Sequence, residues 1–143
     1  MTQIIQDARG AAAFHTPEDF RDRVGDTTRN VVDGKAAIRS AWDALIDELL
    51  SIRGYKDDWD GEGSQAPHPA LVDAALKLAL ALKGNGSVPA DRVVAGVNAT
   101  VTFEWFAPEG YTEIEVSSPL DAEMRRIVRG ADKAEVYRLV RFW

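Results

Sequence analysis

The sequence predicts an α+β domain in which two main helices pack on one face of a three- to five-stranded antiparallel sheet. Two observations support this prediction. Apolar residues recur at steps of three and four over residues 35–53 and 69–82, and the repeat changes to two after Pro89. The chain has 143 residues, the length of one domain. We expect residues 34–143 to form that domain and residues 1–33 to be a weakly ordered N-terminal extension.

Helical periodicity is strongest over residues 35–53, which Gly54 ends. A second helix begins at Pro69, with His68 at the N-cap, and stops at the Gly84-Asn85-Gly86 turn. It is apolar over more than half of its circumference, so we expect it to be mostly buried. The apolar face of the first helix consists of Ile38, Ala41, Trp42, Leu45, Ile46, Leu49 and Leu50.

The N-terminal extension carries one weaker helix signal. Thr16 followed by Pro17 is typical of a helix start and predicts a short helix over residues 17–24. The polar residues 25–30 predict a loop between this helix and the next one.

Strand signals dominate the second half of the chain. Residues 92–95 predict a short strand, and residues 100–105 and 111–117 predict a hairpin around the Pro-Glu-Gly turn. The C-terminal segment has two interpretations. We favour a second hairpin of residues 122–128 and 134–141, and the alternative is a helix over residues 120–128.

Composition excludes several classes of site. With no cysteine there is no disulfide, thiolate zinc site or iron–sulfur cluster, and two histidines cannot form a three-histidine metal centre. We therefore predict no metal and no cofactor. No long apolar run or signal peptide is recognisable, so we expect a cytoplasmic protein without membrane contact.

Net charge indicates which partners to expect. The chain carries 17 basic and 23 acidic residues, for a net charge of −6. Nucleic-acid binding needs clustered lysine and arginine, so we expect no nucleic-acid partner. The acids concentrate in the first half of the chain, which would suit a basic protein partner.

A loop over residues 57–64 crowds four carboxylates among glycines and contains the candidate binding residues Asp58, Trp59, Asp60 and Glu62. The spacing partly matches a calcium loop that starts at Asp58, but its twelfth position is Pro69 instead of a bidentate acid. The favoured interpretation is structural: Trp59 anchors the loop in the core while the carboxylates cap backbone amides.

The predicted hairpin contains a second candidate site. Strand alternation directs Phe103 and Trp105 to the core, and Glu104, Glu113 and Glu115 outward. Phe106 and Tyr111 then flank the turn outside the core, as a docking patch for a basic partner. Phe106 and Tyr111 are the candidate binding residues of this patch.

Catalytic patterns are weak. Asp60 with Glu62, or Glu104 with Glu113 or Glu115, could form a pair for acid–base chemistry. Ser64 lacks the Gly-x-Ser-x-Gly setting of a nucleophile. We assign no catalytic residue.

The segment from Trp-Asp-Gly-Glu-Gly-Ser at 59–64 through Phe-Glu-Trp at 103–105 to Glu-Ile-Glu-Val at 113–116 resembles a family of small uncharacterised bacterial proteins. The resemblance covers residues 40–141 and implies the order helix, loop, helix, antiparallel sheet, with no activity. We expect a non-enzymatic protein–protein interaction module of antitoxin, immunity or defence-associated type. The alternative is a small hydrolase or a ligand- or metal-binding domain that uses the acidic loop.

Overall fold

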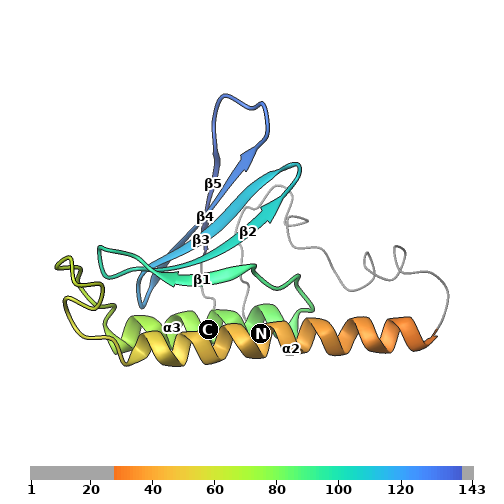
Figure 1. Cartoon of the computed structure of the whole chain (residues 1–143). Helices are drawn as coiled ribbons and strands as arrows, with labels where there is room; N and C mark the ends of the chain where they lie inside the picture. The colour runs from red at the N-terminus through yellow and green to blue at the C-terminus, as the bar shows by residue number, and fades with distance from the viewer. Residues whose placement is uncertain (1–27, 140–143) are drawn as a thin grey trace.

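A computed structural model describes residues 28–139, with side chains from residue 33 onward (Figure 1). Within these residues two helices precede five strands, so the predicted α+β class is confirmed. The helices are α2 (Thr28–Arg53) and α3 (Pro69–Gly84). The strands are β1 (Arg92–Ala95), β2 (Val101–Ala107), β3 (Gly110–Ser118), β4 (Asp121–Val128) and β5 (Glu135–Leu139).

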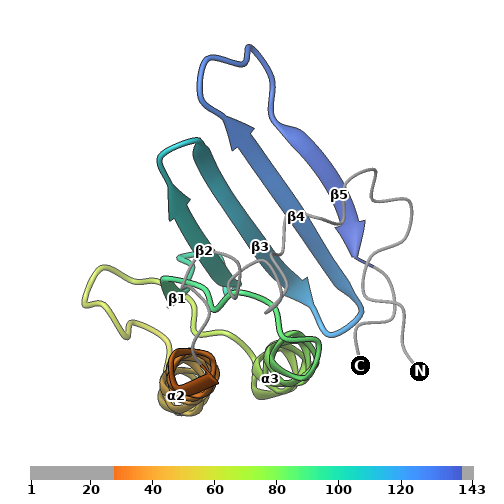
Figure 2. The same cartoon turned by 90° about the vertical axis from the view of Figure 1, so that its right-hand side faces the viewer.

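The two helices lie side by side and antiparallel on one face of the sheet (Figures 1 and 2). The predicted start of α3 is confirmed: His68 Nδ1 accepts a hydrogen bond from the Ala70 amide at 3.1 Å, and Pro69 occupies the first turn, where no amide donor is needed. At the other end, the Asn85 amide donates to the Ala81 carbonyl at 3.0 Å. The helix therefore has caps at both ends.

Helix α2 starts earlier than predicted. The sequence suggested a loop over residues 25–30, and this is wrong from Thr28 onward. The strongly periodic segment nucleates the helix. Each residue added after that gains one backbone hydrogen bond at a small cost in conformational entropy, so the helix also includes weaker helix formers upstream, Gly34 among them. The short helix predicted over residues 17–24 lies outside the described residues.

The sheet is a meander in the order β1-β2-β3-β4-β5, with every neighbouring pair antiparallel. The favoured C-terminal hairpin is confirmed by β4 and β5, and the alternative helix over residues 120–128 is wrong. In β4, Ala122 and Met124 are buried while Glu123 and Arg125 are exposed, which is the period of two that a half-buried strand requires. The predicted residues 140–141 lie beyond the described part.

The core lies between the helix pair and the sheet. Trp42 of α2 is fully buried, and its indole Nε1 donates to the Ser87 carbonyl at 2.9 Å. One cross-strand row of the sheet contributes Val93, Phe103, Ile114, Met124 and the partly buried Tyr137. This row confirms that Phe103 and Ile114 face the core.

Two leucines that the periodicity assigned to buried faces are exposed, so these assignments are wrong. Leu50 of α2 is 53% exposed and Leu80 of α3 is 55% exposed. A helix in a two-layer domain contacts only the sheet and one neighbouring helix, so an apolar stripe wider than these contacts continues onto the surface. The described residues place no helix on the opposite face of the sheet (Figure 2).

Candidate functional site

An apolar cluster occupies the sheet face that points away from the helices. Phe106, Tyr111 and Ile127 are directly paired across β2, β3 and β4, and we call them the hairpin patch. The ring centroids of Phe106 and Tyr111 are 5.3 Å apart. Phe106 is 54% exposed and Ile127 is 42% exposed. The structure thus brings Phe106 and Tyr111 together outside the core, as predicted, and adds Ile127.

The acidic residues beside the hairpin patch belong to a hydrogen-bonded network. The Tyr111 hydroxyl lies 2.7 Å from a carboxylate oxygen of Glu104 and 2.7 Å from one of Glu113. Glu104 also pairs with Arg92, and Glu113 pairs with Arg125 at 2.6 Å. Each carboxylate of this like-charged cross-strand pair therefore contacts a guanidinium, and Arg125 is also paired with Glu123 at 3.2 Å.

These contacts set the protonation states of the network. Burial, together with the adjacent Glu113 and Glu104 carboxylates, raises the pKa of Tyr111 far above its ordinary value, so the phenol keeps its proton. The hydrogen bond from Arg92 holds the pKa of Glu104 below its usual range. A general acid needs a raised pKa, so Glu104 is poorly suited to the acid–base role considered for it.

The network also changes the predicted character of the patch. The sequence suggested an acidic rim, but Arg92 and Arg125 neutralise the two nearest glutamates. The Arg92 guanidinium carbon lies 5.3 Å from the centroid of the Phe106 ring, within the range of a cation–π contact. The hairpin patch is therefore apolar, and arginines are paired with the glutamates beside it.

The acidic loop uses its carboxylates to organise its own backbone. Asp58 accepts a hydrogen bond from the Gly63 amide at 2.7 Å, and Asp57 accepts one from the Ala66 amide at 3.0 Å. Asp60 accepts from the amides of Glu62 and Ser64 and from the Ser64 hydroxyl. These contacts support the structural interpretation of the loop carboxylates.

Trp59 does not reach the core, so its predicted role as a core anchor is wrong. Its side chain is half-buried, its ring stacks on Tyr55 at 5.1 Å, and its Nε1 donates to the Gln65 carbonyl at a long 3.4 Å. The tight turn, in which Asp58 has φ 66° and Gly61 has φ 74°, keeps this short segment on the surface.

Replacing Asp60 by asparagine is expected to loosen the loop. Hydrogen bonds from the Ser64 hydroxyl and the Glu62 amide lower the pKa of Asp60 below its ordinary 3.8. Because the pKa of Asp60 is lower in the folded state, the stabilisation of the loop by its carboxylate is present above pH 3.8. It is lost as the pH falls through the folded-state pKa. We expect the hydrogen-exchange protection of the Glu62 and Ser64 amides to fall over that range. Asp60→Asn should reduce the protection at pH 7 and flatten its pH dependence.

A matched control for this prediction is Asp47→Asn on the exposed side of α2, which should leave loop protection unchanged. Equal protection of the two amides at pH 7 in the wild-type chain and in Asp60→Asn would show that Asp60 does not hold the loop.

The structure places no evident metal centre on the loop. Among the described side chains, no group of three or more histidine, aspartate or glutamate residues converges to hold a metal ion. The carboxylates of Asp57, Asp58 and Asp60 instead accept main-chain hydrogen bonds. Within the same part of the chain, neither helix is long and apolar enough to cross a membrane.

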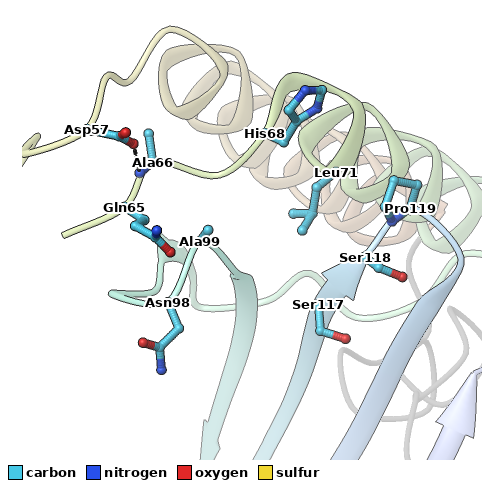
Figure 3. Close-up of a pocket in the computed structure, with 10 residues that line it drawn as sticks. All are labelled: Asp57, Gln65, Ala66, His68, Leu71, Asn98, Ala99, Ser117, Ser118 and Pro119. Atoms are coloured by element: carbon cyan, nitrogen blue, oxygen red, sulfur yellow. Dashed lines mark hydrogen bonds between the residues drawn. The ribbon is translucent and has the colours of Figure 1, made fainter.

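A cavity of about 380 Å³ lies beside the acidic loop, where three segments meet (Figure 3). Gln65 and Asn98, which form an isolated β-bridge, line one side of the cavity, and Ser117 lines it at the end of β3. Leu71 of α3 and Asp57 are also among its lining residues, but the Asp57 carboxylate already accepts a hydrogen bond from the Ala66 amide. Sequence reasoning missed this cavity because its residues come from segments with no shared motif.

The two predicted candidate sites do not meet. The loop that holds Asp58, Trp59, Asp60 and Glu62 lies at one end of the helix pair, and the turn of the β2–β3 hairpin points away from the helices (Figures 1 and 2). The two sites are therefore spatially separate.

No protein-family model, no curated protein and no solved structure matches the chain. The resemblance described for residues 40–141 stays a prediction.

Proposed function

We propose that this protein is a non-enzymatic interaction module that binds another protein through the hairpin patch. One observation carries the proposal: Phe106 and Ile127 expose large apolar side chains on either side of Tyr111, on the sheet face that neither described helix covers. Clustered exposed apolar groups are typical of protein-binding surfaces, and aromatic residues supply much of the binding energy there.

The ion pairs beside the hairpin patch indicate which forces would hold a partner there. Glu104 and Glu113 are engaged with arginines, so the contact itself depends on apolar burial and on the rigid Tyr111 network. The net charge of −6 acts at longer range and favours a basic partner during approach. A small acidic module of this kind suits an antitoxin, immunity or defence-associated role in the bacterial cytoplasm.

The alternative, a small hydrolase or a ligand-binding domain at the acidic loop, has less support. Its carboxylates accept internal hydrogen bonds, and the pKa of Asp60 is lowered, whereas a catalytic acid needs a raised one.

The test is a quantitative co-purification of the tagged full chain from its native host, followed by titration of the recovered partner. The double variant Phe106→Ala with Ile127→Ala should weaken binding about tenfold, or about 1.4 kcal/mol, while the circular dichroism spectrum stays unchanged. Tyr111 is left in place because its loss would disturb the carboxylate network.

The matched control is Val97→Ala with Leu120→Ala, which removes comparable exposed apolar groups away from the patch. If the control weakens binding as much as the patch variant, or if a folded patch variant binds normally, the hairpin patch is not the interface.

A further inference from the structure

A second surface lies on the helix layer, away from the hairpin patch. A groove of about 450 Å³ runs between the N-terminal half of α2 and the C-terminal end of α3. We call it the helix groove. Its lining includes Lys35, Ile38, Arg39, Leu80, Lys83 and Gly84.

The floor of the helix groove is apolar. Leu80 is more than half exposed, and Ile38 is half-buried against the core. Gly84 adds no side chain, and a methyl group built there would meet no atom within 4 Å, so the end of the groove is open. The last carbonyls of α3 already accept the amides of Asn85, Gly86 and Ser87. Side chains, rather than free backbone groups, would therefore contact whatever binds there.

The rim of the helix groove is basic, although the chain as a whole carries a net negative charge. Lys35 and Arg39 are exposed and lie one helical turn apart. Within residues 33–139, no ion pair engages either of them. Lys83 on the opposite side is partly neutralised by Asp43, with 2.5 Å between Lys83 Nζ and Asp43 Oδ1. Two cations on this rim are thus available to a bound carboxylate.

We propose that the helix groove binds an acidic, leucine-bearing amphipathic segment of a partner protein. An apolar side chain of that segment would cover Leu80 and Ile38, and its carboxylates would pair with Lys35 and Arg39. An amphipathic helix in an apolar groove between two helices is a recurring mode of peptide recognition, in which the flanking charges set orientation and selectivity. The proposal rests on its own residues and is independent of the hairpin patch.

A nucleic acid fits these observations less well. A phosphate backbone needs many cations along its path, and here two free cations border an apolar floor on a chain of net charge −6. Because the exposed Leu80 lies in the same groove as Lys35 and Arg39, the groove favours a ligand that is both apolar and acidic.

The experiment uses the full chain and a fluorescein-labelled amphipathic peptide of leucine, alanine and glutamate, with leucines at helical spacing. Fluorescence anisotropy should show saturable binding that weakens as salt is added. Lys35→Glu with Arg39→Glu should weaken the affinity about tenfold, and Leu80→Ser should weaken it to a similar degree. A peptide with serine in place of leucine should not bind.

The matched control is Lys56→Glu with Lys77→Glu, which changes the net charge equally at two exposed lysines outside the groove. This control should change the affinity about twofold or less, and the Phe106→Ala, Ile127→Ala variant should bind the peptide normally. The proposal is overturned if the wild-type chain does not bind the peptide, or if the control weakens binding as much as the groove variant. It is also overturned if light scattering shows a dimer that Lys35→Glu with Arg39→Glu dissociates, because the occupant is then a second copy.

Discussion

Replacing Trp42 by alanine is expected to lower the free energy of unfolding by about 5 kcal/mol. The side chain is fully buried, and removing a buried tryptophan costs about 3–5 kcal/mol. Its loss also leaves the buried Ser87 carbonyl without the indole donor at 2.9 Å, which adds about 1–3 kcal/mol. Domains of this size have a total stability of about 5–15 kcal/mol, so the variant should be close to unfolding.

Trp59 supplies the comparison within the same chain. It is half-buried, stacks on Tyr55 and makes one long hydrogen bond, so Trp59→Ala should lower the free energy of unfolding by about 1–2 kcal/mol. Urea denaturation followed by circular dichroism measures both variants without relying on tryptophan fluorescence.

Trp42→Phe keeps the test informative if the alanine variant does not fold. Phenylalanine retains most of the apolar contact and loses the hydrogen bond, so we expect a destabilisation between those of the two alanine variants. An equal loss for Trp59→Ala and Trp42→Ala would contradict this prediction, because the surface contacts of Trp59 would then contribute as much stability as the buried Trp42.

The second large effect is expected at Gly110, the first residue of β3. Gly110 pairs with Ala107 of β2 on one side and with Val128 of β4 on the other. A methyl group at this position would lie 2.2 Å from the Ile127 carbonyl oxygen and 3.1 Å from the Val128 Cα. Both are backbone atoms, so relief requires β3 and β4 to separate locally. We expect Gly110→Ala to cost about 3 kcal/mol, at the upper end of typical overpacking penalties.

Thermal denaturation measures this effect, with Gly84→Ala as the control. A methyl group at Gly84 would have no neighbour within 4 Å, so its substitution should change the stability by about 1 kcal/mol or less. Similar melting temperatures for the two variants would show that β4 does not approach β3 closely at this turn. Because Gly110 adjoins Tyr111, a destabilised Gly110→Ala variant should also bind the partner of the hairpin patch more weakly.

Local sequence patterns predicted most of the elements. The change in apolar repeat from about 3.6 to two marked the helices and strands, and the proline and glycine positions marked the start of α3 and the turn between β2 and β3. The placement of Phe106 and Tyr111 outside the core followed from strand alternation and the length of that turn alone. These features depend on residues only a few positions apart in the chain, and a local sequence pattern contains that information.

Sequence patterns gave wrong predictions where the burial of a side chain depended on residues that are distant in the sequence. Leu50 and Leu80 continue apolar stripes that the sheet and the second helix do not reach, so both are exposed. The sequence assigned both Trp42, on an apolar helix face, and Trp59, in a loop of carboxylates and glycines, to the core, but only Trp42 is fully buried.

The sequence by itself determined the class, the number of main helices, the hairpin and the absence of cysteine chemistry, because composition and periodicity are local properties. Only the tertiary structure decided which tryptophan anchors the core, how Arg92 and Arg125 neutralise the two glutamates beside the hairpin patch, and where a basic groove opens on an acidic chain. Arg92 and Arg125 belong to strands on either side of the hairpin, and Lys35 and Leu80 belong to different helices. Such pairings arise from the packing of whole elements, since burial and charge compensation are settled by contacts across the fold.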